Sequence, residues 1–103
     1  MEYVGKIIYD EKLFENRKYI IYGFGEHGKK IYEYMKKIGR ENNVIGFCDK
    51  KAKSIVEAKY LVLLPEEAIE NTNIDFLVGG KYEYEMVQFL LKHKISKIHM
   101  LSI

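Results

Sequence analysis

Residues 19–28 read Tyr-Ile-Ile-Tyr-Gly-Phe-Gly-Glu-His-Gly and join a short apolar run to three glycines with the spacing Gly-x-Gly-x-x-Gly. This spacing is typical of a phosphate-binding turn between a strand and a helix. In such a turn Gly23 permits the sharp exit from the strand, Gly25 lets the backbone approach a pyrophosphate, and Gly28 lets the helix pack closely on the sheet. The helix then offers its unpaired N–H groups to the anion. The motif has this meaning only if a strand precedes it and a helix follows it.

The flanks of the glycine turn meet that condition. The run 18–22 lacks the polar alternation of a half-exposed strand, which predicts a strand buried on both faces of a parallel sheet. From Glu26 onward apolar residues recur at helical spacing, and Gly39 is a suitable stop for the helix. The apolar positions of this helix are Ile31, Tyr34, Met35 and Ile38.

Asp49 follows the next apolar run, 44–48, and is the first candidate for a ligand-binding side chain outside the turn. It lies about 20 positions after Gly28, the distance at which a carboxylate accepts hydrogen bonds from a ribose in dinucleotide-binding folds. An alternative is a turn residue that bonds its own backbone. The lysines nearby favour a 2′-phosphate, but the carboxylate opposes one, so we expect a free ribose diol. These lysines are Lys50, Lys51 and Lys53.

The remaining elements alternate between strand and helix. They are a strand over 59–64, a short helix from Pro65, a strand over 74–78, a helix over 82–93 and a strand over 97–103. Since parallel crossovers are right-handed, we expect an α/β fold with a three-layer, Rossmann-like open parallel sheet. It has about five strands in the order 3-2-1-4-5, with helices on both faces. The switch point then places residues 23–28 and Gly79-Gly80 at the mouth of one crevice.

The two ends of the chain give weaker signals. Residues 1–17 are expected to be a lead-in segment, with a short extended piece at 6–9 and a helical turn capped by Asp10. The strand over 97–103 is expected to be an apolar edge of the sheet, and such edges are usually paired or covered. We therefore expect a homodimer or a continuation into another domain.

Composition limits the class of protein. The 103 residues are enough for one domain, 1–103, and 48% of them are apolar. No apolar run approaches the ~18 residues of a membrane span, and no secretory signal is visible, so we expect a soluble, cytoplasmic protein without a membrane partner. The net charge of +2 comes from 17 basic and 15 acidic residues mixed along the chain, which argues against a nucleic-acid partner.

Other readings of the turn are possible. Residues 23–29 fit a P-loop as far as the lysine, but Lys30 stands where a P-loop needs Ser or Thr for Mg²⁺. His27 is a possible donor to a phosphate or sugar, whereas Glu26 favours the helix dipole and repels an anion. Alternatively, both side chains are simply exposed to solvent, and the glycines form a tight turn that binds no ligand.

No catalytic or metal site is predicted. Cys48 lies in an apolar strand, where a buried thiol is more common than a nucleophile. His93 and His99 do not have the spacing of metal ligands. Tyr32 and Lys36 have the Tyr-x-x-x-Lys spacing of some reductases, but they lie on the helix that leaves the turn. The chain has so many tyrosines and lysines that a chance match is expected.

With these elements in place, residues 18–102 resemble the Rossmann-like nucleotide-binding domains of bacterial sugar-nucleotide and surface-polysaccharide biosynthesis proteins. One similar group is the N-terminal domain of sugar-nucleotide acetyltransferases. The segments that carry the resemblance are Ile20-Ile21-Tyr22-Gly23-Phe24-Gly25-Glu26-His27-Gly28-Lys29, Val44-Ile45-Gly46-Phe47-Cys48-Asp49 and Leu64-Pro65-Glu66-Glu67. The resemblance implies that Gly23, Gly25, Gly28 and Asp49 hold a nucleotide-linked sugar, and His27 matches the histidine of that turn.

The acetyltransferases continue into a hexapeptide-repeat β-helix that binds acetyl-CoA and supplies the catalytic histidine, and this chain has no such segment. Related epimerases and dehydratases likewise need a further domain. We therefore expect a nucleotide-binding module for NAD or a nucleotide sugar such as a UDP-sugar, part of a larger carbohydrate-modifying protein or assembly and not catalytic alone. Alternatives are an NAD(H)-responsive regulatory dimer and a degenerate scaffold that has lost its ligand. The candidate binding residues are Gly23, Phe24, Gly25, Glu26, His27, Gly28, Asp49 and Gly79.

Overall fold

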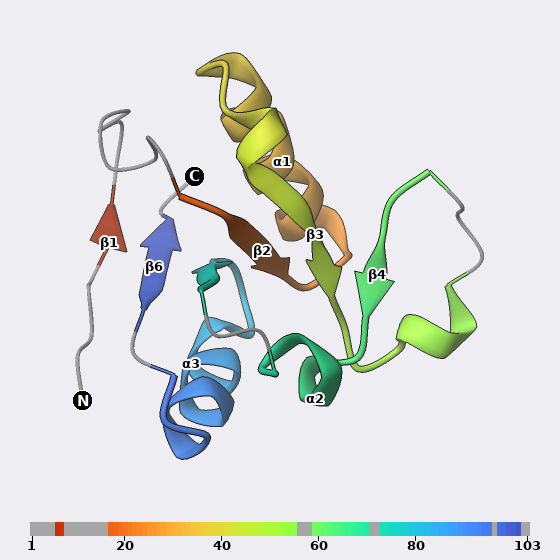
Figure 1. The fold of residues 1–103 in the computed structure, drawn as a ribbon, viewed down its shortest axis with the longest axis vertical. Coiled ribbons are helices and arrows are strands. Elements are labelled where there is room, and N and C mark those ends of the chain that lie inside the picture. Colours follow the sequence, from red (N-terminus) through yellow and green to blue (C-terminus); the bar gives the residue numbers. More distant parts are fainter. Residues whose placement is uncertain (1–5, 8–16, 56–58, 71–72, 96, 102–103) are drawn as a thin grey trace.

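The computed structural model describes residues 6–7, 17–55, 59–70, 73–95 and 97–101, and Figure 1 shows their arrangement. Within these ranges the chain forms one parallel sheet with helices packed against it. The strands are β1 (Lys6–Ile7), β2 (Tyr19–Tyr22), β3 (Val44–Cys48), β4 (Val62–Leu63), β5 (Asp75–Val78) and β6 (Ile98–Leu101). The α-helices are α1 (Glu26–Lys37), α2 (Pro65–Ala68) and α3 (Glu83–Lys92), and 3₁₀ turns occupy Glu41–Asn43 and Ala52–Ser54.

The strands follow the order β1-β6-β5-β2-β3-β4, and every neighbouring pair is parallel. From β4 to β6 this is the order 3-2-1-4-5 that the sequence predicts, so the open α/β sheet is confirmed. β2 lies between β3 and β5, with Ile20 opposite both Gly46 and Phe76. Its four residues are buried, as expected for a strand covered on both faces.

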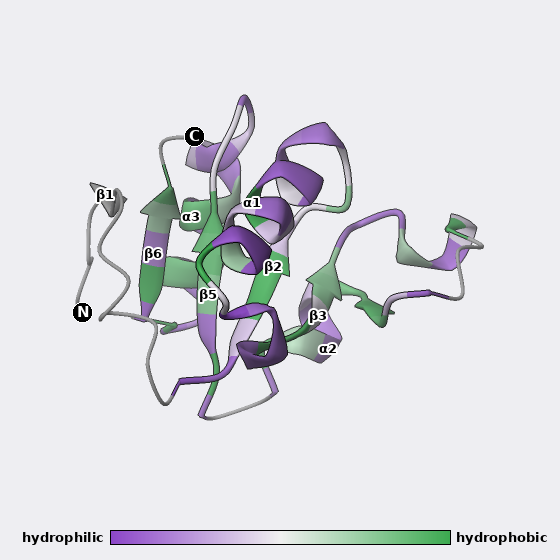
Figure 2. Ribbon diagram, turned by 90° about the horizontal axis from the view of Figure 1, so that it is seen from above, coloured by the Kyte–Doolittle hydropathy of each residue, from purple (hydrophilic) through white to green (hydrophobic). Residues whose placement is uncertain are grey.

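Two hydrophobic cores cover the two faces of the sheet. Because side chains alternate along a strand, Tyr19 and Ile21 enter the core under α1, while Ile20 and Tyr22 enter the core under α2 and α3. Figure 2 shows the central strands coloured hydrophobic, and the visible face of α1 largely hydrophilic. The buried apolar residues of the helices are Ile31 and Met35 in α1, Ala68 in α2, and Val87 and Leu90 in α3.

The predicted helix limits are close to the observed ones. α1 begins at Glu26 as expected and ends at Lys37, and Gly39 follows with a φ of +75°. That left-handed conformation favours glycine, so the predicted stop is confirmed. α3 is one residue shorter at each end than the predicted helix 82–93, because Tyr82 and His93 form its caps.

The expectation that the last strand is an edge of the sheet is wrong. β1 pairs with β6, with Lys6 opposite Met100 and Ile7 opposite Leu101. The short extended piece expected in the lead-in segment therefore forms the outer strand on this side. A two-residue strand carries almost no periodic signal, so the sequence did not show where it pairs.

Some expectations concern residues whose structure is not described. The helical turn capped by Asp10 lies outside the described residues, as do the positions 102–103 of the predicted last strand. β4, which covers Val62–Leu63, is shorter than the predicted strand 59–64. Among the described residues it pairs only with β3, at Phe47–Val62 and Cys48–Leu63, and Pro65 starts the next helix shortly afterwards.

Candidate functional site

The glycine turn connects the central strand β2 to α1 at the carboxyl edge of the sheet. Gly23 has a φ of +103°, which L side chains rarely adopt, and its N–H donates to the carbonyl oxygen of Cys48 at 2.6 Å. A Cβ at Gly23 would also lie 3.1 Å from Cε of Met86 in α3. Gly23 is thus required by the conformation of the turn itself.

Gly28 and Gly25 differ in what the fold demands of them. A Cβ at Gly28 would lie 1.9 Å from the carbonyl oxygen of Gly23, so only glycine lets α1 approach the end of β2 this closely. Gly25 is exposed and has the extended angles φ −107° and ψ −154°, which other residues adopt freely. A Cβ there would meet no described atom within 4 Å.

Gly25 is also the N-cap of α1, and no side chain caps this helix within the described residues. The first N–H groups of a helix lack intrahelical partners, and the positive end of the helix dipole favours an anion. The only acid in the first turn is Glu26, whose exposed carboxylate lies 3.7 Å from Nζ of Lys30. The open approach at Gly25 therefore leads to backbone donors rather than to a capping side chain.

Asp49 holds the turn to the loop that follows β3. Its Oδ2 accepts a hydrogen bond from the N–H of Phe24, and its Oδ1 accepts one from the N–H of Lys51, both at 2.8 Å. The alternative of a turn residue that bonds its own backbone is therefore confirmed by the bond from Lys51. Because each carboxylate oxygen has two lone pairs, both oxygens keep acceptor capacity for a further donor. The carboxylate is half-buried and lies next to the glycine turn.

The side chain of Phe24 faces the core and is only 8% exposed. Its ring centroid lies 4.8 Å from that of Phe47 and 5.9 Å from that of Tyr60, both in edge-on contacts. Nζ of Lys29 lies 4.9 Å from the same ring, at the distance of a cation–π contact. Phe24 thus supports the turn from beneath, and its backbone, rather than its ring, is presented at the candidate site.

His27 brings the turn into contact with the loop after β5. A Cβ at Gly80 would lie 2.4 Å from Cγ of His27, so the histidine side chain lies directly against the backbone of Gly80. Gly79 is buried, and a Cβ there would lie 2.7 Å from the carbonyl oxygen of Leu101. The two loops are thus in contact, as the topology predicts, but a Cβ at Gly79 would face Leu101 of β6 and one at Gly80 would face the turn.

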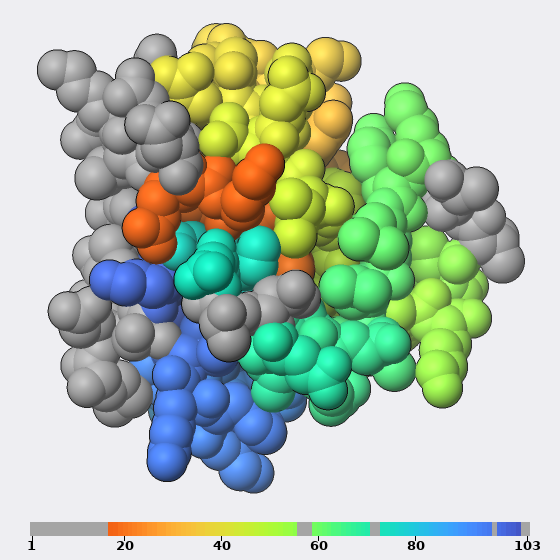
Figure 3. All heavy atoms as spheres, in the orientation of Figure 1, coloured from red at the N-terminus to blue at the C-terminus, as the bar shows by residue number. Residues whose placement is uncertain are grey.

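A polar cluster lies at the opposite, amino edge of the sheet. Asp75, 3% exposed, is bonded to the guanidinium of Arg17, and its Oδ2 lies 2.7 Å from Nε2 of His99. Burial alone raises the pKa of Asp75, but the hydrogen bonds from His99 and Arg17 outweigh it and hold that pKa below its ordinary value. The ring of Tyr19 packs edge-on against His99 at 5.7 Å. In Figure 3 the start of β2 lies against the start of β5 on this face.

This cluster is not among the sites predicted from the sequence, although the sequence contains a signal for it. Asp75 and His99 interrupt two apolar runs near the same ends of adjacent parallel strands. Ionisable residues in buried strands are rare unless they are paired. Because the cluster lies at the edge away from the glycine turn, we assign it to the stability of the sheet.

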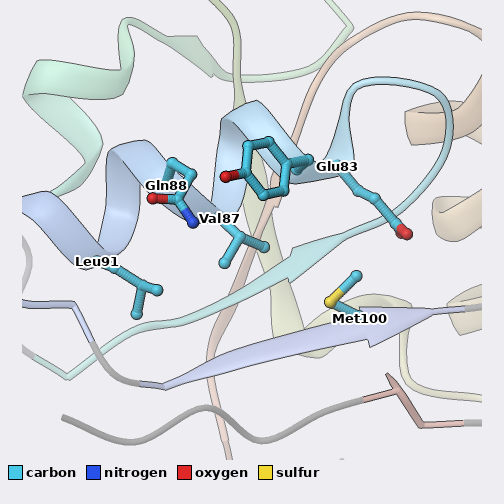
Figure 4. A pocket seen from close by; sticks show the side chains of 6 residues that line it. Glu83, Val87, Gln88, Leu91 and Met100 are labelled. Atoms are coloured by element: carbon cyan, nitrogen blue, oxygen red, sulfur yellow. The ribbon is translucent and has the colours of Figure 1, made fainter.

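A shallow hollow of about 340 Å³ lies between α3 and β6, as Figure 4 shows. None of the candidate binding residues lines it. Its lining residues are Glu83, Tyr84, Val87, Gln88, Leu91 and Met100.

Cys48 is a buried thiol, as expected, and burial raises its pKa far above the ordinary value. Among the residues that the structure describes, no three His, Cys, Asp or Glu side chains are grouped as metal ligands. No helix within those residues is long and apolar enough to cross a membrane.

Comparison with known families confirms the resemblance that the sequence suggested. The model of the PglD N-terminal domain matches residues 18–79, which is more than half of the chain and includes the glycine turn, Asp49 and Gly79. PglD is a sugar-nucleotide acetyltransferase, so the match places the domain in the context of sugar-nucleotide biosynthesis. Comparisons with curated proteins and with solved structures gave no match. The chain belongs to the family of PglD N-terminal domains.

Proposed function

We propose that this domain binds the nucleotide of a sugar nucleotide, such as a UDP-sugar, at the glycine turn. In this proposal it is a cytoplasmic, non-catalytic module of a larger protein or assembly that makes surface polysaccharides. The family match supports the sugar-nucleotide context.

The observation that carries the proposal is the open space at Gly25. Gly23 and Gly28 are glycines because the fold requires them, whereas the described structure leaves room for a larger residue at Gly25. A pyrophosphate that approaches the backbone at this position explains a glycine that the protein alone does not need. The uncapped N–H groups of α1 begin at the same place and are suited to bind it.

Asp49 supports the same placement of the ligand. Its two backbone hydrogen bonds fix the carboxylate beside the turn, and both oxygens can still accept a hydrogen bond from a ribose hydroxyl. Lys50 and Lys51 follow it on the surface and lower the cost of bringing a negatively charged ligand to this edge. A diol on Asp49 and a pyrophosphate at Gly25 are the arrangement found in dinucleotide-binding turns.

The test is a calorimetric titration and thermal-shift panel with UDP, UDP-sugars, ADP, ATP, CoA, NAD(H) and NADP(H). We expect nucleotide to stabilise the wild-type protein, and Gly25→Ala to keep or slightly raise the melting temperature while losing the shift on addition of ligand. Glu33→Ala, an exposed change on α1, is the matched control and should bind like the wild type. Wild-type protein that binds none of these nucleotides, or Gly25→Ala protein that binds as tightly as wild type, would contradict the proposal and favour a degenerate scaffold.

We also propose that the module acts as a homodimer or beside a further domain. The outer strands of the described sheet are β1, which covers β6, and β4, so both of these present an edge. Leu61, which directly precedes β4, is 53% exposed and places an apolar side chain at the β4 edge. Sedimentation equilibrium tests the dimer, and Leu61→Lys should weaken it. A monomer at all concentrations that also binds no other domain of its parent protein would refute this.

A further inference from the structure

The crevice of a nucleotide-binding sheet has two halves, one on each side of the switch point. In a dinucleotide complex the pyrophosphate crosses the glycine turn, and each nucleotide lies over one half of the sheet. Here the switch point lies between β2 and β5, so one half is formed by β3 and β4 and the other by β5 and β6. The described residues leave different amounts of space and make different contacts in these two halves.

The half on the β3 side offers a place for a nucleotide. Gly25 is exposed with free space where a side chain would start, and Asp49 lies at the end of β3 with spare acceptor capacity. The side chain of Phe24 turns into the core and does not cover this side. Glu26 is directed into solvent, where its carboxylate faces Lys30 on the next turn of α1.

On the β5 side the glycine turn is in direct contact with the loop after β5. The side chain of His27 lies against Gly80, where a Cβ would be 2.4 Å from Cγ and 2.8 Å from Nδ1 of the ring. Gly79 packs against the backbone of Leu101, where a Cβ would be 2.7 Å from the carbonyl oxygen. Met86 of α3 reaches to within 3.1 Å of the Cβ position of Gly23. The contact of His27 lies between the turn and the loop after β5, whereas that of Gly79 joins the end of β5 to β6 and that of Met86 joins α3 to the turn.

Gly80 forms the seat for the histidine. Its φ of +93° favours glycine, and the missing side chain leaves the space in which the ring of His27 lies. His27 is at the second position of α1, so its backbone is fixed by the helix while its ring spans the gap to the β5 loop. One side chain thus connects the glycine turn to the loop after β5.

We propose that His27 is a specificity-determining residue that closes the β5 half of the crevice, so that the site accepts a ligand with one nucleotide and excludes a dinucleotide. This inference rests on the proposed function, and it selects a nucleoside diphosphate, free or bearing a sugar, over NAD. The sugar would then extend from the pyrophosphate along the exposed start of α1 rather than over β5.

The test compares base-matched pairs of ligands by calorimetry: UDP with diuridine diphosphate, and ADP with NAD. Each pair shares one nucleotide and differs in the second, so the ratio of the two dissociation constants reports the β5 half alone. For the wild type we expect the dinucleotide to bind no more tightly than the nucleoside diphosphate. His27→Ala should shift this ratio in favour of the dinucleotide by about tenfold or more, which is about 1.4 kcal/mol. Glu33→Ala, an exposed change further along α1, is the control and should leave the ratio unchanged.

Three results would overturn the inference. A wild-type protein that prefers the dinucleotide tenfold would show that the β5 half is open. An unchanged ratio in His27→Ala, with the nucleoside diphosphate still bound, would refute the role of His27 and leave the proposed function intact. If no nucleotide binds to the wild type, the proposed function fails and this inference fails with it. His27 is exposed, so we expect its alanine variant to fold, and its melting temperature checks this.

Discussion

Gly28→Ala should destabilise this domain strongly, whereas Gly25→Ala, three residues earlier in the same motif, should not. The added methyl at Gly28 would lie 1.9 Å from the carbonyl oxygen of Gly23 and 2.8 Å from its carbonyl carbon. An ordinary contact for such a carbon is at least 3.4 Å, so α1 and the end of β2 would have to separate by about 1.5 Å. Both partners are backbone, which no rotamer change can relieve. Ile31 and Met35, which α1 buries, would lose packing as the helix moved.

The magnitudes separate the two variants clearly. Overpacking typically costs about 1–3 kcal/mol and sometimes more, and a clash between two backbones belongs to the upper end. We therefore expect Gly28→Ala to lower the free energy of unfolding by about 3 kcal/mol, out of the ~5–15 kcal/mol of a typical domain. At Gly25 the extended backbone and the free space accept alanine, which restricts the unfolded chain and adds about 0.4–1 kcal/mol of stability.

Urea unfolding followed by far-UV circular dichroism and tyrosine fluorescence measures both variants, since the chain has nine Tyr and no Trp. The slopes should agree with the wild type, so that the midpoints report stability directly. A difference of less than about 1 kcal/mol between the two variants would refute this account of the turn. A Gly25→Ala variant that is as unstable as Gly28→Ala would refute it too, because the residue would then be required by the fold.

Three further predictions concern other parts of the structure. Asp49→Ala should lose about 1–3 kcal/mol of stability in urea together with nucleotide binding, because two backbone N–H groups lose a charged acceptor; unchanged stability would contradict this. The pKa of Asp75 is lowered on folding, so its contribution to stability is complete above the pKa of an unfolded aspartate and is lost as pH falls through the lower folded value. Urea midpoints between pH 7 and pH 2 should therefore fall less steeply in Asp75→Asn than in the wild type, and parallel curves would count against the ion pair. The Cys48 thiol should react with a disulfide reagent at pH 8 only on unfolding, because burial raises its pKa; modification of native protein at the rate of a free thiol would disprove that burial.

The sequence predicted the centre of the fold better than its margins. β2, the turn and α1 follow from local rules: a run buried on both faces, glycines where the backbone needs them, and apolar residues at helical spacing. The strand order followed because right-handed crossovers leave few alternatives. The pairing of β1 was not predicted, because a strand of two residues is defined by its partner β6 and not by its own sequence pattern.

The candidate site was predictable in position but not in its contacts. The spacing between Gly28 and Asp49 predicted a carboxylate beside the turn, and the hydrogen bond from the N–H of Phe24 to Asp49 confirms that the carboxylate lies there. The contact of His27 with Gly80 joins residues from different βα units, which no local pattern reports. The pairing of Asp75 with His99 depends in the same way on strands that are adjacent only in the folded sheet.

The pairing of β1 with β6 makes the order of synthesis differ from the order of assembly. Lys6 and Ile7 leave the ribosome before the rest of the described chain, and their partners, Met100 and Leu101, emerge after almost all of it. Until then β1 has no strand beside it, and β5 has a free edge while β6 is still being made. Contacts so far apart in sequence carry a loop-closure cost and form slowly. The nascent chain therefore leaves the backbone of β1 unpaired until β6 has been made, and that interval is when pairing with another chain would compete with folding.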